Sequence, residues 1–153
     1  MDINILMQSD AVRIADLDSK PRVLEAVADI FQEAYALDRE AVLEGLGERE
    51  ALGSTGFGRG VAIPHCRIGQ VHRPTAALIR LESPCEFGAA DAVPVNLVFG
   101  LVSPENAGAA HLHALAAISR LSRAEVMLQA LSDAEEPEAL FALLTNQFLR
   151  DAA

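Results

Sequence analysis

Hydrophobic residues recur at helical spacing in the first quarter of the chain. They form one stripe, made by Val23, Leu24, Val27, Phe31 and Ala34. We expect this helix to begin at Asp18 or Ser19, because both residue types cap helices and Pro21 is favoured near the first turn. The stripe predicts that one face of the helix packs against the rest of the protein.

A second helix is predicted from the cap residue Asp38 to about Leu52-Gly53. Its inward-facing residues are Val42, Leu43 and Leu46. Arg49 follows Leu46 by about one turn, so it should lie beside the apolar face and close to the glycine-rich segment that comes next.

Alternation replaces helical periodicity in the middle of the chain. From Thr75 to Glu82, one face carries Ala77, Ile79 and Leu81 and the other carries Arg80 and Glu82. The segment from Val93 to Val102 is almost continuously apolar, which is typical of a strand buried on both faces. Pro94 suits only the first residues of such a strand.

Helical patterns return after this buried strand. One helix is expected from about Asn106 to Arg120, and the capping box Ser122-Arg-Ala-Glu125 should open a short helix. A second box, Ser132-Asp-Ala-Glu135, should precede a final helix. The inward residues of that last helix are Leu140, Phe141, Leu144 and Phe148. The order of helices, strands and helices predicts a single-domain α/β fold over residues 1–153, with one sheet covered by helices on both faces.

The composition limits which residue types can fill the core and which classes of partner the protein can bind. Hydrophobic residues make up 51% of the chain but aromatic residues only 5%, and Trp is absent, so the core must be mainly aliphatic. The net charge of −10 argues against nucleic-acid binding, which depends on Lys and Arg. It favours a partner with a basic docking face.

Cysteine content and the termini point to the cytoplasm. Cys66 and Cys85 match neither a metal spacing nor a disulfide framework, which favours a reduced setting. The start of the chain lacks the basic and apolar regions of a signal peptide, and no apolar run is long enough to cross a membrane. We therefore expect a cytoplasmic protein without direct membrane insertion.

The segment with the clearest chemical meaning is Gly53-Ser-Thr-Gly-Phe-Gly-Arg-Gly-Val-Ala-Ile-Pro-His-Cys-Arg67. Its four glycines within eight residues allow close backbone approach to a ligand, and a short strand, Val61-Ala-Ile63, follows. That strand is expected to end at Pro64 and to carry His65 at its tip. A neutral imidazole is a competent nucleophile near pH 7. The segment thus predicts a rigidly held histidine beside a backbone cradle for an anion, the alternative being a glycine-rich turn followed by a packed histidine.

Nucleotide-binding loops do not fit this segment. The phosphate loop of nucleotidases requires a lysine, and the one lysine of the chain is Lys20. The dinucleotide fingerprint requires a different glycine spacing, and both motifs follow a strand and open a helix, whereas this loop precedes a strand.

The segment from Gly53 to His65 resembles the active-site motif G-S-T-G-[IV]-G-x-G-[IV]-A-[IV]-P-H of the IIA components of the bacterial phosphotransferase system, fructose/mannitol class. Arg49-Glu50 before it and His111-Leu-His-Ala-Leu115 after it fit as well, so the resemblance covers nearly all of the chain. It is strongest to the nitrogen-related regulatory branch, EIIA-Ntr.

The resemblance implies an α/β sandwich with a central mixed sheet. It also implies that His65 accepts a phosphoryl group from a phosphohistidine on a small HPr-like carrier (NPr), without a cofactor or a metal. Such a protein is a phosphotransferase-type phosphocarrier that regulates target proteins according to its phosphorylation state.

His111 is the second candidate catalytic histidine. On a helix it shares a stripe with Leu115 and Ile118, so it should face inward near the helix N-terminus, which favours anions. There it can donate to a phosphoryl oxygen on His65, and the family places its second histidine at this position. His113 lies on the opposite side of the helix and should be either at the surface or behind the residues of the site. The alternative for His111 is a core histidine bonded to backbone.

The remaining candidates are a cation and four loop residues. Arg49 can pair with a phosphoryl group through its guanidinium, and the family also has an arginine here; alternatively it pairs with the neighbouring Glu48 or Glu50. Phosphoryl contacts are also expected from Ser54, Thr55, Gly56 and Gly58. The two hydroxyls can equally serve only to shape the turn.

Three residues depart from the family pattern. Phe57 replaces Ile or Val and can widen an apolar docking rim, and Arg59 adds a positive charge that is either near the site or simply solvated. Cys66 directly follows His65, which suggests redox gating, but adjacent side chains of an extended chain point to opposite faces, which favours a buried small side chain. A zinc site built from His65, Cys66, His111 and His113 is disfavoured, because two histidines in a His-x-His spacing diverge on a helix and would point together only on a strand.

Three functions remain open on sequence grounds. The leading one is a regulatory phosphoacceptor. The second is a transport IIA component that passes phosphate from His65 to a sugar-specific IIB, and the third is a non-catalytic module that binds a small anion at the glycine loop.

Overall fold

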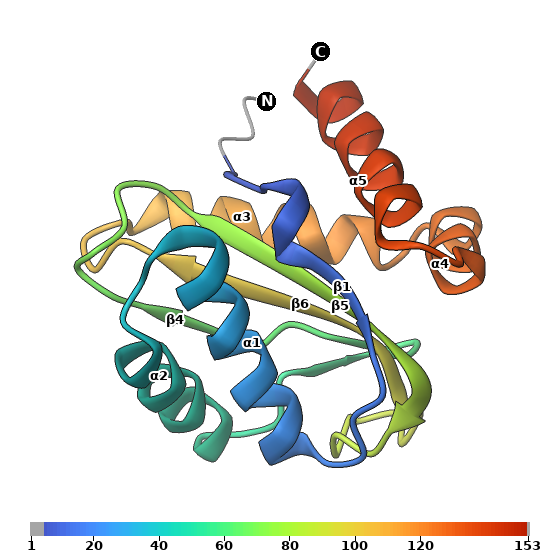
Figure 1. Cartoon of the computed structure of the whole chain (residues 1–153), viewed down its shortest axis with the longest axis horizontal. Coiled ribbons are helices and arrows are strands. Elements are labelled where there is room, and N and C mark those ends of the chain that lie inside the picture. Colours follow the sequence, from blue (N-terminus) through green and yellow to red (C-terminus); the bar gives the residue numbers. More distant parts are fainter. Residues whose placement is uncertain (1–4, 153) are drawn as a thin grey trace.

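The computed structural model describes the backbone of residues 5–152 and the side chains of residues 5–146. The helices are η1 (Ser9–Ala11), α1 (Lys20–Tyr35), α2 (Arg39–Ala51), α3 (Ala109–Leu121), α4 (Glu125–Asp133) and α5 (Pro137–Ala152). The strands are β1 (Val12–Ala15), β2 (Gly56–Gly58), β3 (Val61–Ala62), β4 (His65–Arg67), β5 (Thr75–Cys85) and β6 (Val95–Ser103). Figure 1 shows a layered α/β fold, as the sequence predicted.

The sheet is mixed and β6 lies at its centre. Its order is β1-β5-β6-β3-β2, and β4 also pairs with β6. Strands β3 and β4 both run parallel to β6, whereas β5 is antiparallel to it. Almost every residue of β6 is buried, which confirms that this apolar segment is covered on both faces.

Two hydrophobic clusters fill the two faces of the sheet. One cluster is built on α1 and α2, with Val27, Phe31 and Leu46 against Ala77 and Ile79. The other lies under α3, α4 and α5 on the opposite face. Figure 1 shows the corresponding arrangement, with α1 and α2 on one side of the sheet and α3 on the other. The predicted two-sided covering of a single sheet is therefore confirmed.

The predicted helix starts near the N-terminus are confirmed at their caps. The Ser19 hydroxyl accepts a hydrogen bond from the backbone N–H of Arg22, and the Asp38 carboxylate accepts one from the N–H of Glu40. The short parallel strand β1 was not expected, because its four residues carry no clear alternation. Two predicted boundaries differ from those of the structure. Strand β5 continues to Cys85 instead of ending at Glu82, and α3 begins at Ala109 instead of near Asn106.

Both predicted capping boxes are wrong. Ser122 ends α3 instead of opening a helix, and its hydroxyl donates to the carbonyl of Ser119. Ser132 lies in the last turn of α4, where its hydroxyl accepts from the Asn96 amide of β6. A tertiary contact thus uses the Ser132 side chain that the local pattern assigned to a cap.

The last helix begins at Pro137, a residue type that suits a first helical turn. Of its predicted inward residues, Leu140 and Leu144 are fully buried and Phe141 packs against them. Phe148 lies outside the described side chains. Among the described residues, no helix is both long and apolar enough to cross a membrane.

Candidate active site

His65 lies within an extended segment rather than at the tip of a strand. Residues 61–67 run alongside β6, first as β3 and then as β4, and the carbonyl of Pro64 between them accepts from the N–H of Leu101. The expected strand does end before Pro64, as β3, but the chain stays extended past the proline, which lacks an N–H, and pairs with β6 again as β4. His65 is the first residue of β4, which is anchored to the central strand.

A hydrogen bond orients the His65 ring. Its Nδ1 lies 2.7 Å from the carbonyl oxygen of Ile63. Since a carbonyl can only accept, Nδ1 carries the proton and donates it, and the lone pair of the neutral ring is on Nε2. Burial lowers the pKa of His65, and the positive charges of Arg49 and Arg67 lower it further, although the Ile63 hydrogen bond acts in the opposite direction. A neutral ring with a free Nε2 lone pair is the form that a nucleophile requires.

His111 faces His65 from α3. The two ring centroids are 5.4 Å apart and the ring planes meet at 50°. His111 is 4% exposed, and its Nδ1 lies 2.7 Å from Oγ of Ser103, at the end of β6. This confirms the inward orientation, but the partner is a buried side chain rather than the backbone. Burial lowers the pKa of His111 to about 4, with Coulombic contributions from His65 and Arg67, so this ring is also neutral at pH 7.

Both rings line a cavity of about 400 Å³ between α2 and α3. Arg49, Leu52 and Arg67 line it as well, so Arg49 lies in the same cavity as both histidines. The Arg49 Nη1 donates to the carbonyl of Gly53 at 2.8 Å, rather than to a neighbouring glutamate as the alternative had it. Glu48 lines it too, so the cavity combines a candidate nucleophile with two cationic side chains and one carboxylate. A nucleophile and cations are the groups that transfer of an anionic phosphoryl group requires.

The glycine segment does not form the expected open anion cradle. The Glu50 carboxylate accepts hydrogen bonds from both the backbone N–H and the hydroxyl of Thr55, and it also pairs with Lys20 Nζ at 3.1 Å. The Ser54 hydroxyl donates to the carbonyl of Phe87 and accepts from the N–H of Gly56. These groups already have partners inside the protein, which favours the turn-shaping role for both hydroxyls.

The rest of the segment is a hairpin rather than a loop. Strands β2 and β3 are antiparallel, and the connection uses positive φ angles at Gly58 (116°), Arg59 (58°) and Gly60 (82°). The Arg59 N–H donates to the Asp91 carboxylate at 2.9 Å, and its guanidinium reaches the carbonyl of Arg123. Arg59 is therefore not among the residues that line the His65 cavity.

Cys66 lines the His65 cavity as well, but its sulfur lies against Gly45 and the carbonyl of Val42 in α2 and bonds neither histidine. Cys66 belongs to the cluster under α1 and α2, and burial raises the pKa of its thiol to about 12. A thiol held in the neutral form reacts slowly, which favours a packing role over redox gating. His113 is exposed at the surface of α3, one of its two expected positions. In the described part of the chain, no group of three or more His, Cys, Asp or Glu side chains is placed to hold a metal ion.

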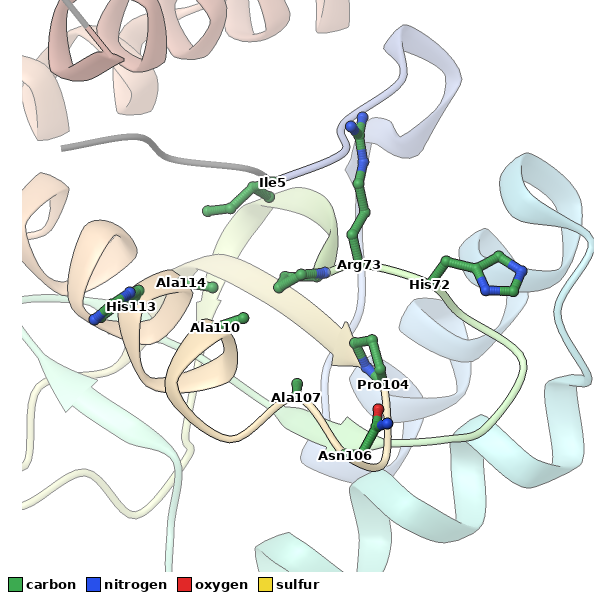
Figure 2. Close-up of a pocket in the computed structure, with 10 residues that line it drawn as sticks. Ile5, His72, Arg73, Pro104, Asn106, Ala107, Ala110, His113 and Ala114 are labelled. Carbon is green, nitrogen blue, oxygen red and sulfur yellow. The ribbon is translucent and has the colours of Figure 1, made fainter.

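A second cavity, of about 240 Å³, lies on the far side of α3 and offers a weaker site. Figure 2 shows the lining residues Ile5, Ala110 and Pro104 around it, while the His72 ring extends away from the others. Its polar side chains therefore do not converge on one point, in contrast to the paired rings of the His65 cavity.

Two functional candidates were missed by sequence reasoning. Glu50 was considered only as a partner for Arg49 and as part of the family resemblance, and Ser103 was not considered. The residue order reveals neither role, because Ser103 meets His111 only when α3 folds back along β6.

Comparisons with known proteins agree with the fold. The family model of the phosphoenolpyruvate-dependent sugar phosphotransferase system, EIIA 2, matches residues 5–147. A nitrogen regulatory protein of Pseudomonas aeruginosa is 42% identical over 130 residues, which is 84% of each chain. One of Bradyrhizobium diazoefficiens is 37% identical over 145 residues, covering 94% of this chain and 95% of the relative. The crystal structure of nitrogen regulatory protein IIA-Ntr from Neisseria meningitidis superposes with a TM-score of 0.83 at 34% identity, covering 90% of this chain and 95% of that one.

Proposed function

The chain belongs to the EIIA 2 family of the phosphoenolpyruvate-dependent sugar phosphotransferase system, and we propose that it is a regulatory phosphoacceptor whose His65 receives a phosphoryl group from an HPr-like phosphohistidine carrier (NPr). The observation that carries the proposal is the orientation of His65. Its Nδ1–H is committed to Ile63, so the Nε2 lone pair is free for attack. The Arg49 guanidinium in the same cavity supplies positive charge.

The transfer is a single displacement. The Nε2 lone pair of His65 forms a bond to phosphorus as the P–N bond of the carrier phosphohistidine breaks, and that electron pair returns to the carrier imidazole. The proton on Nδ1 of His65 stays in its bond to Ile63 throughout. Arg49 and His111 line the same cavity, which supports a role for both in stabilising the charge on the phosphoryl oxygens.

Phosphorylation would reverse the local charge of this surface. The phosphoryl group adds close to two negative charges to a cavity lined by two arginines, Arg49 and Arg67, and one carboxylate, Glu48. A partner that docks there distinguishes the two states by electrostatics alone. Since the relatives described above are named as nitrogen regulatory proteins, we favour regulation of target proteins over sugar transport. Two free buried cysteines favour a cytoplasmic location.

Two alternative functions, an anion-binding module and a transport component, would require other features. An anion-binding module would need free donors in the glycine segment, and those of Thr55 and Gly56 are already bonded. A transport component would share the chemistry of His65 and differ only in its acceptor, so a sugar-specific IIB with a reactive cysteine is the discriminating reagent.

The decisive experiment is intact mass spectrometry after incubation with phosphoenolpyruvate, enzyme I and the carrier. We expect one acid-labile phosphoryl group on the wild type and none on His65→Ala. His113→Ala is the matched control, because His113 is an exposed histidine outside the site, and it should be phosphorylated like the wild type. An unmodified wild type beside a phosphorylated carrier would overturn the proposal. Rapid onward transfer of the phosphoryl group to a IIB cysteine would support a role in transport instead of regulation.

A further inference from the structure

Ser103 connects the end of the central strand to the second histidine of the site. It is the last residue of β6 and is fully buried, and its Oγ lies 2.7 Å from Nδ1 of His111. Its backbone carbonyl accepts from the N–H of Ile68, just beyond β4. The serine is therefore held in place by the sheet, while His111 comes from a helix that packs over it.

The hydrogen bond has two possible directions, with opposite consequences. A neutral imidazole carries one proton, on either Nδ1 or Nε2. If the Ser103 hydroxyl donates to Nδ1, the ring proton is on Nε2, and His111 offers a donor beside His65. If Nδ1 donates to the hydroxyl, Nε2 offers a lone pair, which would repel an oxygen of a phosphoryl group.

Burial selects the first direction. Among the hydrogen bonds of the described residues, the one contact of Ser103 Oγ is with His111 Nδ1. If Oγ accepted, its own hydrogen would be left unpaired in a fully buried position, and such a group costs about 1–3 kcal/mol. Donation by the hydroxyl gives both the Ser103 hydroxyl hydrogen and Nδ1 of His111 a partner.

We propose that Ser103 is a positioning residue for phosphoryl transfer, because its hydroxyl holds His111 in the tautomer that carries the proton on Nε2 and so makes His111 a hydrogen-bond donor toward the phosphoryl group on His65. This inference rests on the proposed function for its catalytic consequence. The tautomer itself is a property of the unphosphorylated protein and can be measured without any transfer.

The first measurement is the nitrogen-15 NMR spectrum of the His111 ring at pH 7. In the wild type we expect a protonated Nε2 and an unprotonated Nδ1. Ser103→Ala removes the hydroxyl and should shift the ring toward a tautomer mixture, whereas Ser103→Thr keeps a hydroxyl and should restore the wild-type pattern. A wild-type ring with its proton on Nδ1 would overturn the proposal without any need for a variant.

The second measurement is the single-turnover rate of phosphoryl transfer from the carrier to His65. We expect Ser103→Ala to slow it about tenfold, since one oriented donor is impaired. Ser122→Ala is the matched control, because Ser122 is also fully buried and hydrogen-bonded but lies at the far end of α3. It should leave the rate within twofold of the wild type.

A double substitution separates positioning from a general structural role. If Ser103 acts through His111, Ser103→Ala should have no further effect on the rate in a His111→Ala background. Equal effects in both backgrounds would overturn the proposal. Absence of phosphorylation in the wild type would instead refute the proposed function, and the NMR measurement would still decide the tautomer.

Discussion

The glycine segment and the histidine pair are neighbours in the fold but use their polar groups in opposite ways. In the glycine segment, Thr55 and Arg59 donate their backbone N–H groups to the carboxylates of Glu50 and Asp91. In the histidine pair, each ring uses Nδ1 for an internal hydrogen bond and has Nε2 remaining. A motif that looks like a ligand cradle is thus internally hydrogen-bonded, and the proposed chemistry depends on two atoms, Nε2 of His65 and Nε2 of His111, that the fold leaves available.

The largest expected effect tests whether the glycine segment is a scaffold. Glu50→Ala should lower the free energy of unfolding by about 3 kcal/mol, because it leaves the donors of Thr55 and the Lys20 ammonium without their partner. The Glu50 side chain is only 7% exposed, so water cannot easily replace it. Urea unfolding measures the change, with the exposed Glu48→Ala of the same helix as control. A loss below 0.5 kcal/mol, the size typical of surface substitutions, would contradict the scaffold role.

The next largest effect tests the role of Arg49 in the cavity of the histidine pair. Arg49→Met should slow phosphoryl transfer to His65 by about ten- to hundredfold, because it removes the guanidinium from the cavity while keeping the apolar stem. Arg22→Met, on an exposed part of α1, should leave the rate unchanged. Single-turnover kinetics provide the measurement. Equal rates for the two variants would show that the charge of Arg49 is not used.

The neutrality of the histidine pair predicts a pH dependence of stability. The pKa of His111 is lowered to about 4, against about 6.5 in the unfolded chain. As pH falls below 6.5, the unfolded state takes up a proton that the folded state does not, so stability is lost on acidification. This loss should reach about 1–2 kcal/mol between pH 7 and pH 5. His111→Asn should reduce the decline in urea unfolding; an unchanged decline would show that His111 titrates normally in the fold.

The smallest effects come from two glycines with opposite expectations. At Gly60, φ is +82° and an added Cβ would lie 2.9 Å from the Asn96 side-chain oxygen, so Gly60→Ala should lower stability by about 1–2 kcal/mol. At Gly47, in the interior of α2, an added Cβ meets nothing within 4 Å. Gly47→Ala should raise stability by about 0.5–1 kcal/mol. Thermal unfolding of both variants checks the pair. A stability gain for Gly60→Ala would contradict the assigned hairpin geometry, and a loss for Gly47→Ala would contradict the open space at that position of α2.

Local signals in the sequence were sufficient for much of the fold. Ser19 and Asp38 were predicted as helix caps because capping depends on residues three or fewer positions apart. The strand buried on both faces was predicted from its continuous apolar run, and the inward position of His111 from the helical spacing of apolar residues. Burial selects apolar residues at these positions, so the sequence pattern reports it directly. The wrong capping boxes at Ser122 and Ser132 show the limit of this reasoning, since the same local pattern was overridden where Asn96 bonded the Ser132 hydroxyl.

The sequence by itself determined the α/β class, the family and the identity of the histidine presented beside the central strand, because these depend on local pattern and on a long, specific motif. Only the tertiary structure decided which polar groups form hydrogen bonds inside the protein and which remain available to a ligand. Glu50 meets Thr55, Ser103 meets His111 and Asp91 meets Arg59 through contacts between separate elements. A hydrogen bond in a buried site depends on which groups folding brings within 3 Å, and residue order alone does not encode that choice.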